Sequence, residues 1–300
     1  MPKASFTSTD NRQMEVEYET FGDPSHPALL MIMGYSAQMT AWPEGFIKKL
    51  ASAGYYVIRF DNRDCGLSTH LDGVLVDVGP VIAAALFDDP IPPIPYTLVD
   101  MAGDAVALLD HLGIERAHVA GMSLGGMVSQ VVAYTHPHRV MTLTSISSQP
   151  GDPEVGQPTM EASAVIFEEA PAGMSREDYI ESSLNWQVWQ SQKYRDDNLS
   201  RTAAALAYDR AFYPEGATRQ LAAVYGTGRR HDQVATISVP TLVIHGTDDT
   251  LITPSGGERT AELVPNSTLV MVDDMGHDLP QPLWPLLTNA IVDHLSRVQA

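Results

Sequence analysis

The sequence predicts an α/β fold, in which a mostly parallel sheet is covered by helices on both faces. Short apolar runs alternate with segments whose apolar residues recur at helical spacing, an order typical of such sheets. The clearest example is residues 117–121, which lead through a glycine-flanked turn at 121–125 into a helical segment at 126–134. With 300 residues, 44% of them apolar, the chain can form one large domain that carries an insertion.

Seven strands are expected from the short apolar runs, near residues 14–20, 28–33, 55–60, 117–121, 140–146, 240–245 and 268–272. The first crossing helix is expected from about residue 44 to 53, where Gly54 follows as a stop. The last helix is expected from about residue 283 to 298. The proline-rich stretch 89–95 predicts a stiff connecting loop at the border of the site.

Residues 148–235 interrupt this alternation of strands and helices. They are polar and helical, and they carry the aromatic side chains of Trp186, Trp189, Tyr194, Tyr208, Phe212 and Tyr213. The simplest interpretation is that these aromatics pack the small core of the segment itself. A few are expected to face a substrate, because binding pockets are mainly apolar.

Ser123 is the candidate nucleophile. A serine flanked by glycines between a strand and a helix sits on a strained turn that projects its hydroxyl out of the sheet. A hydroxyl is a weak nucleophile at its ordinary pKa, so it needs a base, and the base needs an acid that orients it. The alternative interpretation is that Ser123 only caps an ordinary helix.

One candidate for each partner follows later in the chain. Asp249 comes after the apolar run 240–245, and His277 comes after the run 268–272. Both positions lie just beyond the carboxyl ends of predicted strands, where open α/β sheets place their active sites. Asp248 is a rival for the acid, and a purely structural loop histidine is the alternative for His277.

The chain order of serine, acid and histidine is that of the α/β-hydrolases, and nearly the whole sequence resembles this superfamily. The resemblance implies a mostly parallel eight-stranded sheet flanked by helices, with a helical cap inserted after the sixth strand. It assigns residues 1–147 and 236–300 to the core and residues 148–235 to the cap. Residues 61–68 match the early loop of the family, and residues 100–114 match the helix that leads to the nucleophile strand.

The spacing of the family also bears on the site. It places the acid three residues after a glycine, which selects Asp249 over Asp248, although the proline that usually follows is displaced to Pro254. Two departures are Met33 in place of the usual histidine and Asp64 in place of a glycine. With residues 41–43, they most resemble the subgroup of aclacinomycin methylesterase and related actinobacterial carboxylesterases.

By family position, the backbone N–H groups of Tyr35 and Leu124 are expected to form an oxyanion hole. The expected substrate pocket is apolar and comprises Met33, Gly34, Met39, Met122 and Trp186. The resemblance therefore implies hydrolysis of carboxylic esters of small to medium apolar substrates through an acyl-enzyme intermediate. Thioesterase, lactonase, C–C hydrolase and cofactor-free perhydrolase activities use the same triad, and a ligand receptor without turnover is a further alternative.

No cofactor or metal is expected, because the histidines lack ligand spacing and no glycine-rich phosphate loop is present. Cys65, the single cysteine, is expected to be a small buried hydrophobic residue, and His245 a hydrogen-bonded core residue. The net charge of −19 argues against nucleic acid or anionic membranes as partners. The partner should be a small-molecule ester, and a cytoplasmic location is expected because no apolar signal segment or membrane span is recognised.

Overall fold

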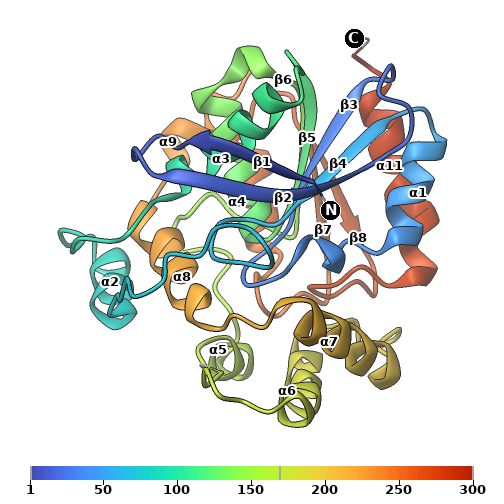
Figure 1. The fold of residues 1–300 in the computed structure, drawn as a ribbon. Helices are drawn as coiled ribbons and strands as arrows, with labels where there is room; N and C mark the ends of the chain where they lie inside the picture. The colour runs from blue at the N-terminus through green and yellow to red at the C-terminus, as the bar shows by residue number, and fades with distance from the viewer. Residues whose placement is uncertain (1, 169, 299–300) are drawn as a thin grey trace.

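One sheet of eight strands forms the centre of the molecule in the computed structural model, which describes residues 2–168 and 170–298 (Figure 1). The order of the strands across the sheet is β1-β2-β4-β3-β5-β6-β7-β8. β1 pairs with β2 and β2 with β4 in antiparallel fashion, and every other neighbouring pair is parallel. The strands are β1 (Lys3–Thr7), β2 (Gln13–Phe21), β3 (Ala28–Ile32), β4 (Tyr56–Phe60), β5 (Ala117–Met122), β6 (Val140–Ile146), β7 (Thr241–Gly246) and β8 (Thr268–Val272). The predicted α/β-hydrolase fold is confirmed.

Helices cover both faces of this sheet: α1 and α11 on one face, α3 and α4 on the other (Figure 1). The α-helices are α1 (Glu44–Ser52), α2 (Val78–Leu86), α3 (Leu98–His111), α4 (Leu124–Thr135), α5 (Met160–Ile166), α6 (Arg176–Ser182), α7 (Asp197–Ala211), α8 (Glu215–Thr227), α9 (His231–Val234), α10 (Ser255–Leu263) and α11 (Trp284–Leu295). The short 3₁₀ helices in the described part of the chain are η1 (Met39–Ala41), η2 (Pro137–Arg139), η3 (Ser183–Val188) and η4 (Gln281–Leu283). None of the described helices is long and apolar enough to cross a membrane.

The central strands are buried on both faces, which explains why they appear in the sequence as continuous apolar runs. In β3 every residue is buried, and alternate side chains enter different cores. Leu30 and Ile32 pack with α3 and α4, whereas Leu29 and Met31 pack with α1 and α11. Two separate cores therefore hold the helical layers against the sheet.

Most of the expected elements lie within two residues of their predicted bounds, and one strand was not expected. β1 is a five-residue edge strand whose register pairs Lys3 with Glu17 and Thr7 with Gln13. Only one end of β2 continues across to β4, so β1 extends the sheet as an outer ribbon. The predicted last helix is shorter than expected, since α11 ends at Leu295.

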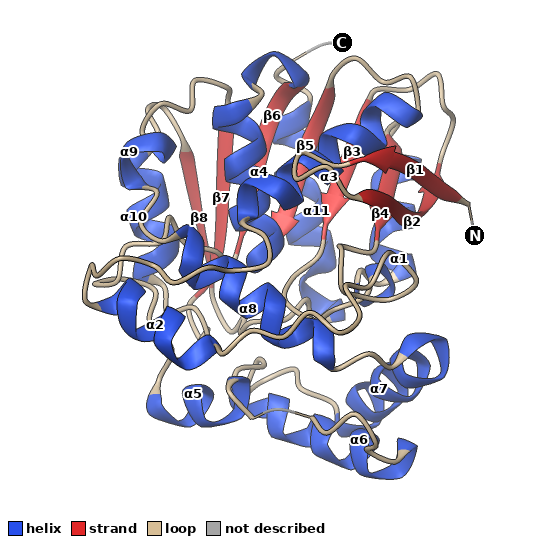
Figure 2. Ribbon diagram, turned by 60° about the vertical axis from the view of Figure 1, so that its left-hand side comes forward, coloured by secondary structure: helices blue, strands red, loops and turns tan. Residues whose placement is uncertain are grey.

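The segment between β6 and β7 carries α5 to α9. α5, α6 and α7 form a layer of their own beyond one end of the sheet (Figure 2). α8 packs instead against α2 and α3, and α9 against α4 and α10. The insertion is thus tied to the core through its last two helices as well as through its outer layer.

Candidate active site

The turn between β5 and α4 holds Ser123 in a strained backbone conformation. Its φ of +57° and ψ of −125° lie in a region that residues other than glycine rarely adopt. Its backbone N–H donates to Ile146 O at 2.9 Å, and Ser148 Oγ donates to Ser123 O at 2.8 Å. The serine side chain makes no capping hydrogen bond to α4, so helix capping does not explain its presence.

The glycines around Ser123 are required by close backbone contacts. A Cβ at Gly121 would lie 2.1 Å from Gly125 O, and a Cβ at Gly125 would lie 2.0 Å from Ile32 O. Neither distance is compatible with a side chain, because both obstacles are backbone atoms. The glycine-flanked pattern therefore reflects how tightly α4 approaches β5 and β3.

Asp249 and His277 are brought together by the turns after β7 and β8. His277 Nδ1 lies 2.7 Å from Asp249 Oδ2, while Asp249 Oδ1 accepts from the backbone N–H groups of Leu251 and Ile252 at 3.0 and 2.9 Å. Asp249 is only 2% exposed. Asp248, the rival carboxylate, instead accepts a hydrogen bond from Thr247 beside it.

A hydrogen bond to Asp249 fixes the tautomer of the histidine. If Nδ1 carries the donated proton, Nε2 of His277 is free to accept one from another group. No hydrogen bond joins this ring to the Ser123 hydroxyl within residues 2–168 and 170–298. In structures without substrate such a contact is often long, and it tightens when the substrate binds.

A second histidine lies behind the acid, as a core residue. His245 is fully buried, its Nε2 lies 2.7 Å from Ile252 O, and the same nitrogen is 3.5 Å from Asp249 Oδ2. Burial lowers the pKa of His245, which favours the neutral ring. The sequence-based prediction of a hydrogen-bonded core histidine is confirmed.

The loop after β3 runs directly beside the serine. A Cβ at Gly34 would lie 3.1 Å from Ser123 Cβ. Two side chains hold this loop: Asn62 Nδ2 donates to Met33 O at 2.9 Å, and Gln220 Oε1 accepts from Ser36 N at 2.8 Å. The loop that includes Tyr35 is therefore braced both by the core and by α8.

The methionines expected in the pocket lie largely in the interior. Met122, only 3% exposed, packs in the core beneath α1 and α11, and Met33 packs against the same core. Met39 is fully buried in η1, and its N–H donates to Asp61 Oδ1. Trp186, in η3, makes an edge-on contact with Tyr179 at 5.9 Å between ring centres. Whether these residues line a substrate pocket stays a prediction.

The aromatics of the insertion form a cluster around Tyr179. The ring centres of Phe212 and Tyr208 lie 5.2 and 5.7 Å from that of Tyr179, and Trp186 completes the group. The interpretation that these side chains pack the core of the insertion is confirmed for these residues. Tyr213 differs, since its ring stacks on His70 of the core domain at 3.7 Å.

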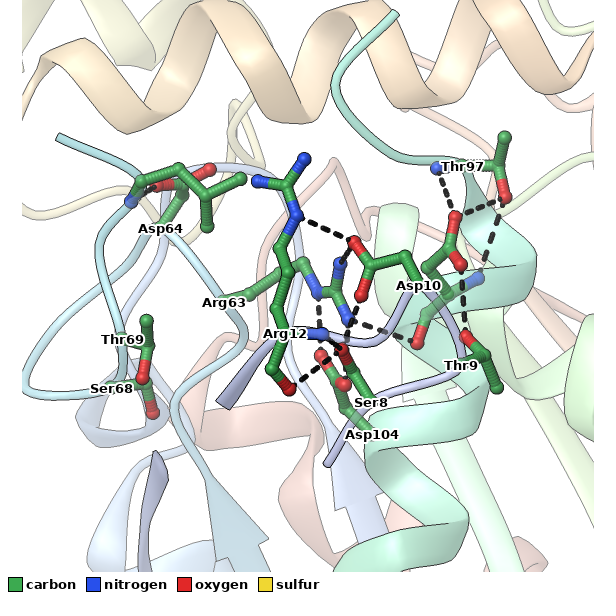
Figure 3. A network of polar contacts seen from close by, with 12 residues as sticks. Ser8, Thr9, Asp10, Arg12, Arg63, Asp64, Ser68, Thr69, Thr97 and Asp104 are labelled. Carbon is green, nitrogen blue, oxygen red and sulfur yellow. Dashed lines mark hydrogen bonds and ion pairs between the residues drawn. The ribbon is translucent and has the colours of Figure 1, made fainter. Parts of the chain in front are cut away.

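The loop after β4 contains a buried network of charges. Arg63 is fully buried and donates to both carboxylate oxygens of Asp104 at 2.6 and 2.7 Å. Its Nη1 also donates to Asp10 Oδ2 at 3.4 Å. Figure 3 shows this guanidinium between the turn at Ser8–Asp10 and Asp104 of α3. Cys65 in the same loop is buried and unpaired, as expected, and burial raises its pKa.

The neighbouring Asp64 explains one departure from the family pattern. Its φ is +61°, a conformation that suits glycine, yet its carboxylate accepts two hydrogen bonds from Arg219 at 2.8 and 2.9 Å. In the same loop Asp61 pairs with Arg210 at 2.8 Å. Because Arg210 and Arg219 lie on α7 and α8, these ion pairs fasten the insertion to the core. Sequence reasoning missed them, and the departure at Asp64 was the available signal.

A short stretch of the insertion, residues 188–193, contacts both turns that carry the acid and the histidine. Trp189 O accepts from His277 N at 2.6 Å, and Val188 O accepts from Thr250 Oγ1 at 2.8 Å. Ser191 N donates to the partly buried carboxyl of Asp278, whose pKa is raised to about 6 by desolvation. The geometry of these turns therefore depends on the insertion. No cluster of potential metal ligands occurs among the described residues.

The chain is similar to known proteins both in sequence and in fold. A sequence model of the alpha/beta hydrolase fold matches residues 27–280. Rhodomycin D methylesterase DauP of Streptomyces sp. (strain C5) is 28% identical, across 92% of this chain and 93% of its own. Rhodomycin D methylesterase DnrP of Streptomyces peucetius is 26% identical, across 95% and 96%. The enol-lactonase from Burkholderia xenovorans LB400 has the same fold, with a TM-score of 0.71 at 20% identity over 97% of this chain and 99% of that one.

Proposed function

Since the chain belongs to the alpha/beta hydrolase fold family and is a carboxylic ester hydrolase, we propose that Ser123, His277 and Asp249 form its catalytic triad. The observation that carries the proposal is the 2.7 Å contact between His277 Nδ1 and Asp249 Oδ2, on the two turns after β7 and β8. The strained turn at Ser123 supports it, because strain of this kind is retained where the position of a side chain matters.

In the proposed mechanism the Ser123 hydroxyl attacks the ester carbonyl carbon. Nε2 of His277 takes the serine proton and gives it to the alcohol as the C–O bond breaks, which leaves an acyl-enzyme. Water then attacks the acyl carbon, and the same ring transfers the proton of the water back to the serine oxygen as the acid leaves. Asp249 holds the ring in the required tautomer and stabilises its charged form.

The developing oxyanion needs two hydrogen-bond donors. We assign them to the backbone N–H groups of Leu124, the first residue of α4, and Tyr35. The close approach of Gly34 to Ser123 and the bracing of Ser36 by Gln220 favour a loop that is already in place before substrate binds. Each such donor typically contributes about 2.7–4 kcal/mol to transition-state stabilisation.

The proposed substrates are neutral esters of small to medium size with an apolar part. Residues 148–235 serve as the cap in this proposal, and the ion pairs of α7 and α8 favour a fixed roof that limits the volume of the site. The net charge of −19 disfavours the approach of anionic esters. The similarity to two rhodomycin D methylesterases makes a bulky methyl ester the foremost candidate.

A substrate panel tests this proposal. It compares p-nitrophenyl esters of graded acyl length, a thioester, a lactone and rhodomycin D. We expect kcat/KM to be highest for short or medium acyl chains or for the methyl ester, and an organophosphate to label the peptide that carries Ser123. A steady rise toward long acyl chains with activation at a lipid interface would contradict the substrate assignment, and labelling elsewhere would contradict the nucleophile.

A further inference from the structure

A buried arginine lies between α8 and α9, and it has no acidic partner among residues 2–168 and 170–298. Arg230 is only 2% exposed, and its guanidinium donates to two backbone carbonyls, Gln149 O at 2.9 Å and Gly228 O at 3.3 Å. Its Nε has no hydrogen-bond partner in the part of the chain that the structure describes. A buried charge is costly unless it is paired, so an arginine held this way lacks a counter-ion.

The closest candidate for that counter-ion is already occupied. Asp152 contacts His231 at 2.9 Å, Arg259 at 2.9 Å and Arg229 at 3.8 Å. Burial lowers the pKa of Arg230 to about 10, so the side chain is still protonated at neutral pH. The protein therefore keeps a positive charge in its interior, and the Nε–H of Arg230 is unpaired among the described residues.

That arginine lines a cavity of about 60 Å³. The cavity has room for about four to six waters, at about 10–15 Å³ for each. Its lining includes the polar side chains of Arg230 and Gln149 and the largely apolar side chains of Leu86, Met127, Val224 and Tyr225. Gln149 Oε1 is a second buried polar atom without a partner among the described residues. Met127 is one helical turn beyond Ser123, and its N–H donates to Ser123 O.

We propose that this cavity is a binding site for a small organic carboxylate, with Arg230 as the counter-ion of the carboxylate and the apolar wall against its hydrocarbon part. Guanidinium groups suit this ligand because their planar array of N–H donors matches the two oxygens of a carboxylate. The Gln149 amide can present its NH₂ group to the same anion by rotation about its last bond. The site does not depend on the role proposed for Ser123.

Calorimetric titration of the full chain with sodium acetate at constant ionic strength tests the proposal. Wild-type protein should show one saturable site in the millimolar range. Arg230→Met, of similar volume but uncharged, should raise the Kd at least about tenfold. The matched control is Arg229→Gln, which removes the neighbouring, more exposed arginine and should leave the Kd within about twofold. Butyrate should bind more tightly than formate if the apolar wall contacts the hydrocarbon part.

Two further measurements separate loss of acetate binding from effects on the active site and from loss of folding. Protein that has reacted with an organophosphate at its active site should bind acetate as before, which separates this cavity from the site of ester cleavage. If Arg230→Met does not fold by circular dichroism, Arg230→Lys and Gln149→Leu replace it, and both should weaken acetate binding. Absence of saturable binding to the wild type, or an unchanged Kd in the Arg230 variants, would overturn the proposal, whether or not the organophosphate reacts.

Discussion

Removing Arg219 should destabilise the protein far more than the loss of a surface ion pair would. Asp64 is 2% exposed, and its carboxylate accepts from Leu71 N at 2.7 Å and twice from Arg219. Arg219→Met removes two of these three hydrogen bonds and leaves the charge buried. Hydrogen bonds to charged groups contribute about 1.5–3 kcal/mol each, and breaking a buried pair costs about 3–5 kcal/mol. We therefore expect the free energy of unfolding to fall by about 3–5 kcal/mol.

A second substitution should reverse much of this loss. Asp64→Gly removes the buried charge and places glycine at a φ of +61°, which relieves a left-handed backbone penalty of about 1–2 kcal/mol. The double variant should therefore be at least about 2 kcal/mol more stable than Arg219→Met alone. Urea unfolding of the single and double variants measures this coupling, and Arg201→Met, in an exposed pair with Glu181, is the matched control. A loss below about 1 kcal/mol for Arg219→Met, or a double variant no more stable than it, would refute the reasoning.

Three other predictions concern the turns around the candidate site. Ser123→Ala should lower kcat by several orders of magnitude without loss of folding, as followed by ester turnover and circular dichroism, and retention of a tenth of the activity would exclude Ser123 as nucleophile. Asp249→Asn should reduce kcat much more than Asp248→Asn, because only Asp249 contacts His277, and equal losses would mean that the wrong acid was chosen. Asp278 has its pKa raised from 3.8 to about 6 by burial, so the native state binds more protons than the unfolded state in that range. The free energy of unfolding should thus fall as pH rises from about 4 to 6, and Asp278→Asn should flatten this fall in urea titrations.

The sequence predicted those parts of the fold that depend on local patterns. The central parallel strands are apolar throughout, so β3, β5 and β7 are visible as runs, and the side chains of the site come directly after such runs. The edge strand β1 was not recognised in the sequence. Every second side chain of this five-residue strand is exposed, so it does not appear as a continuous apolar run. Which carboxylate meets His277 follows from the spacing after Gly246, and the contact between Asp249 and His277 agrees with that choice.

Contacts between distant segments could not be predicted in this way. Arg219 and Asp64 are 155 positions apart, and nothing in the local pattern around Arg219 indicates its partner. The unpaired state of Arg230 is likewise a property of the surrounding fold. The surroundings of Met33 and Met122 also depend on the fold: both side chains pack on the side of α1 and α11. Their place in a substrate pocket stays a prediction.

The contacts of residues 188–193 have a consequence for how this enzyme could evolve or be redesigned. His277 and Thr250 both bond to main-chain carbonyls of this segment, and every amino acid supplies the same carbonyl. Side chains at Val188 and Trp189 can therefore be exchanged while both main-chain hydrogen bonds are kept. Adding or deleting one residue there would instead shift the carbonyls by up to about 3.5 Å along the chain. Substitution libraries in this segment should yield active variants far more often than loop grafts of altered length.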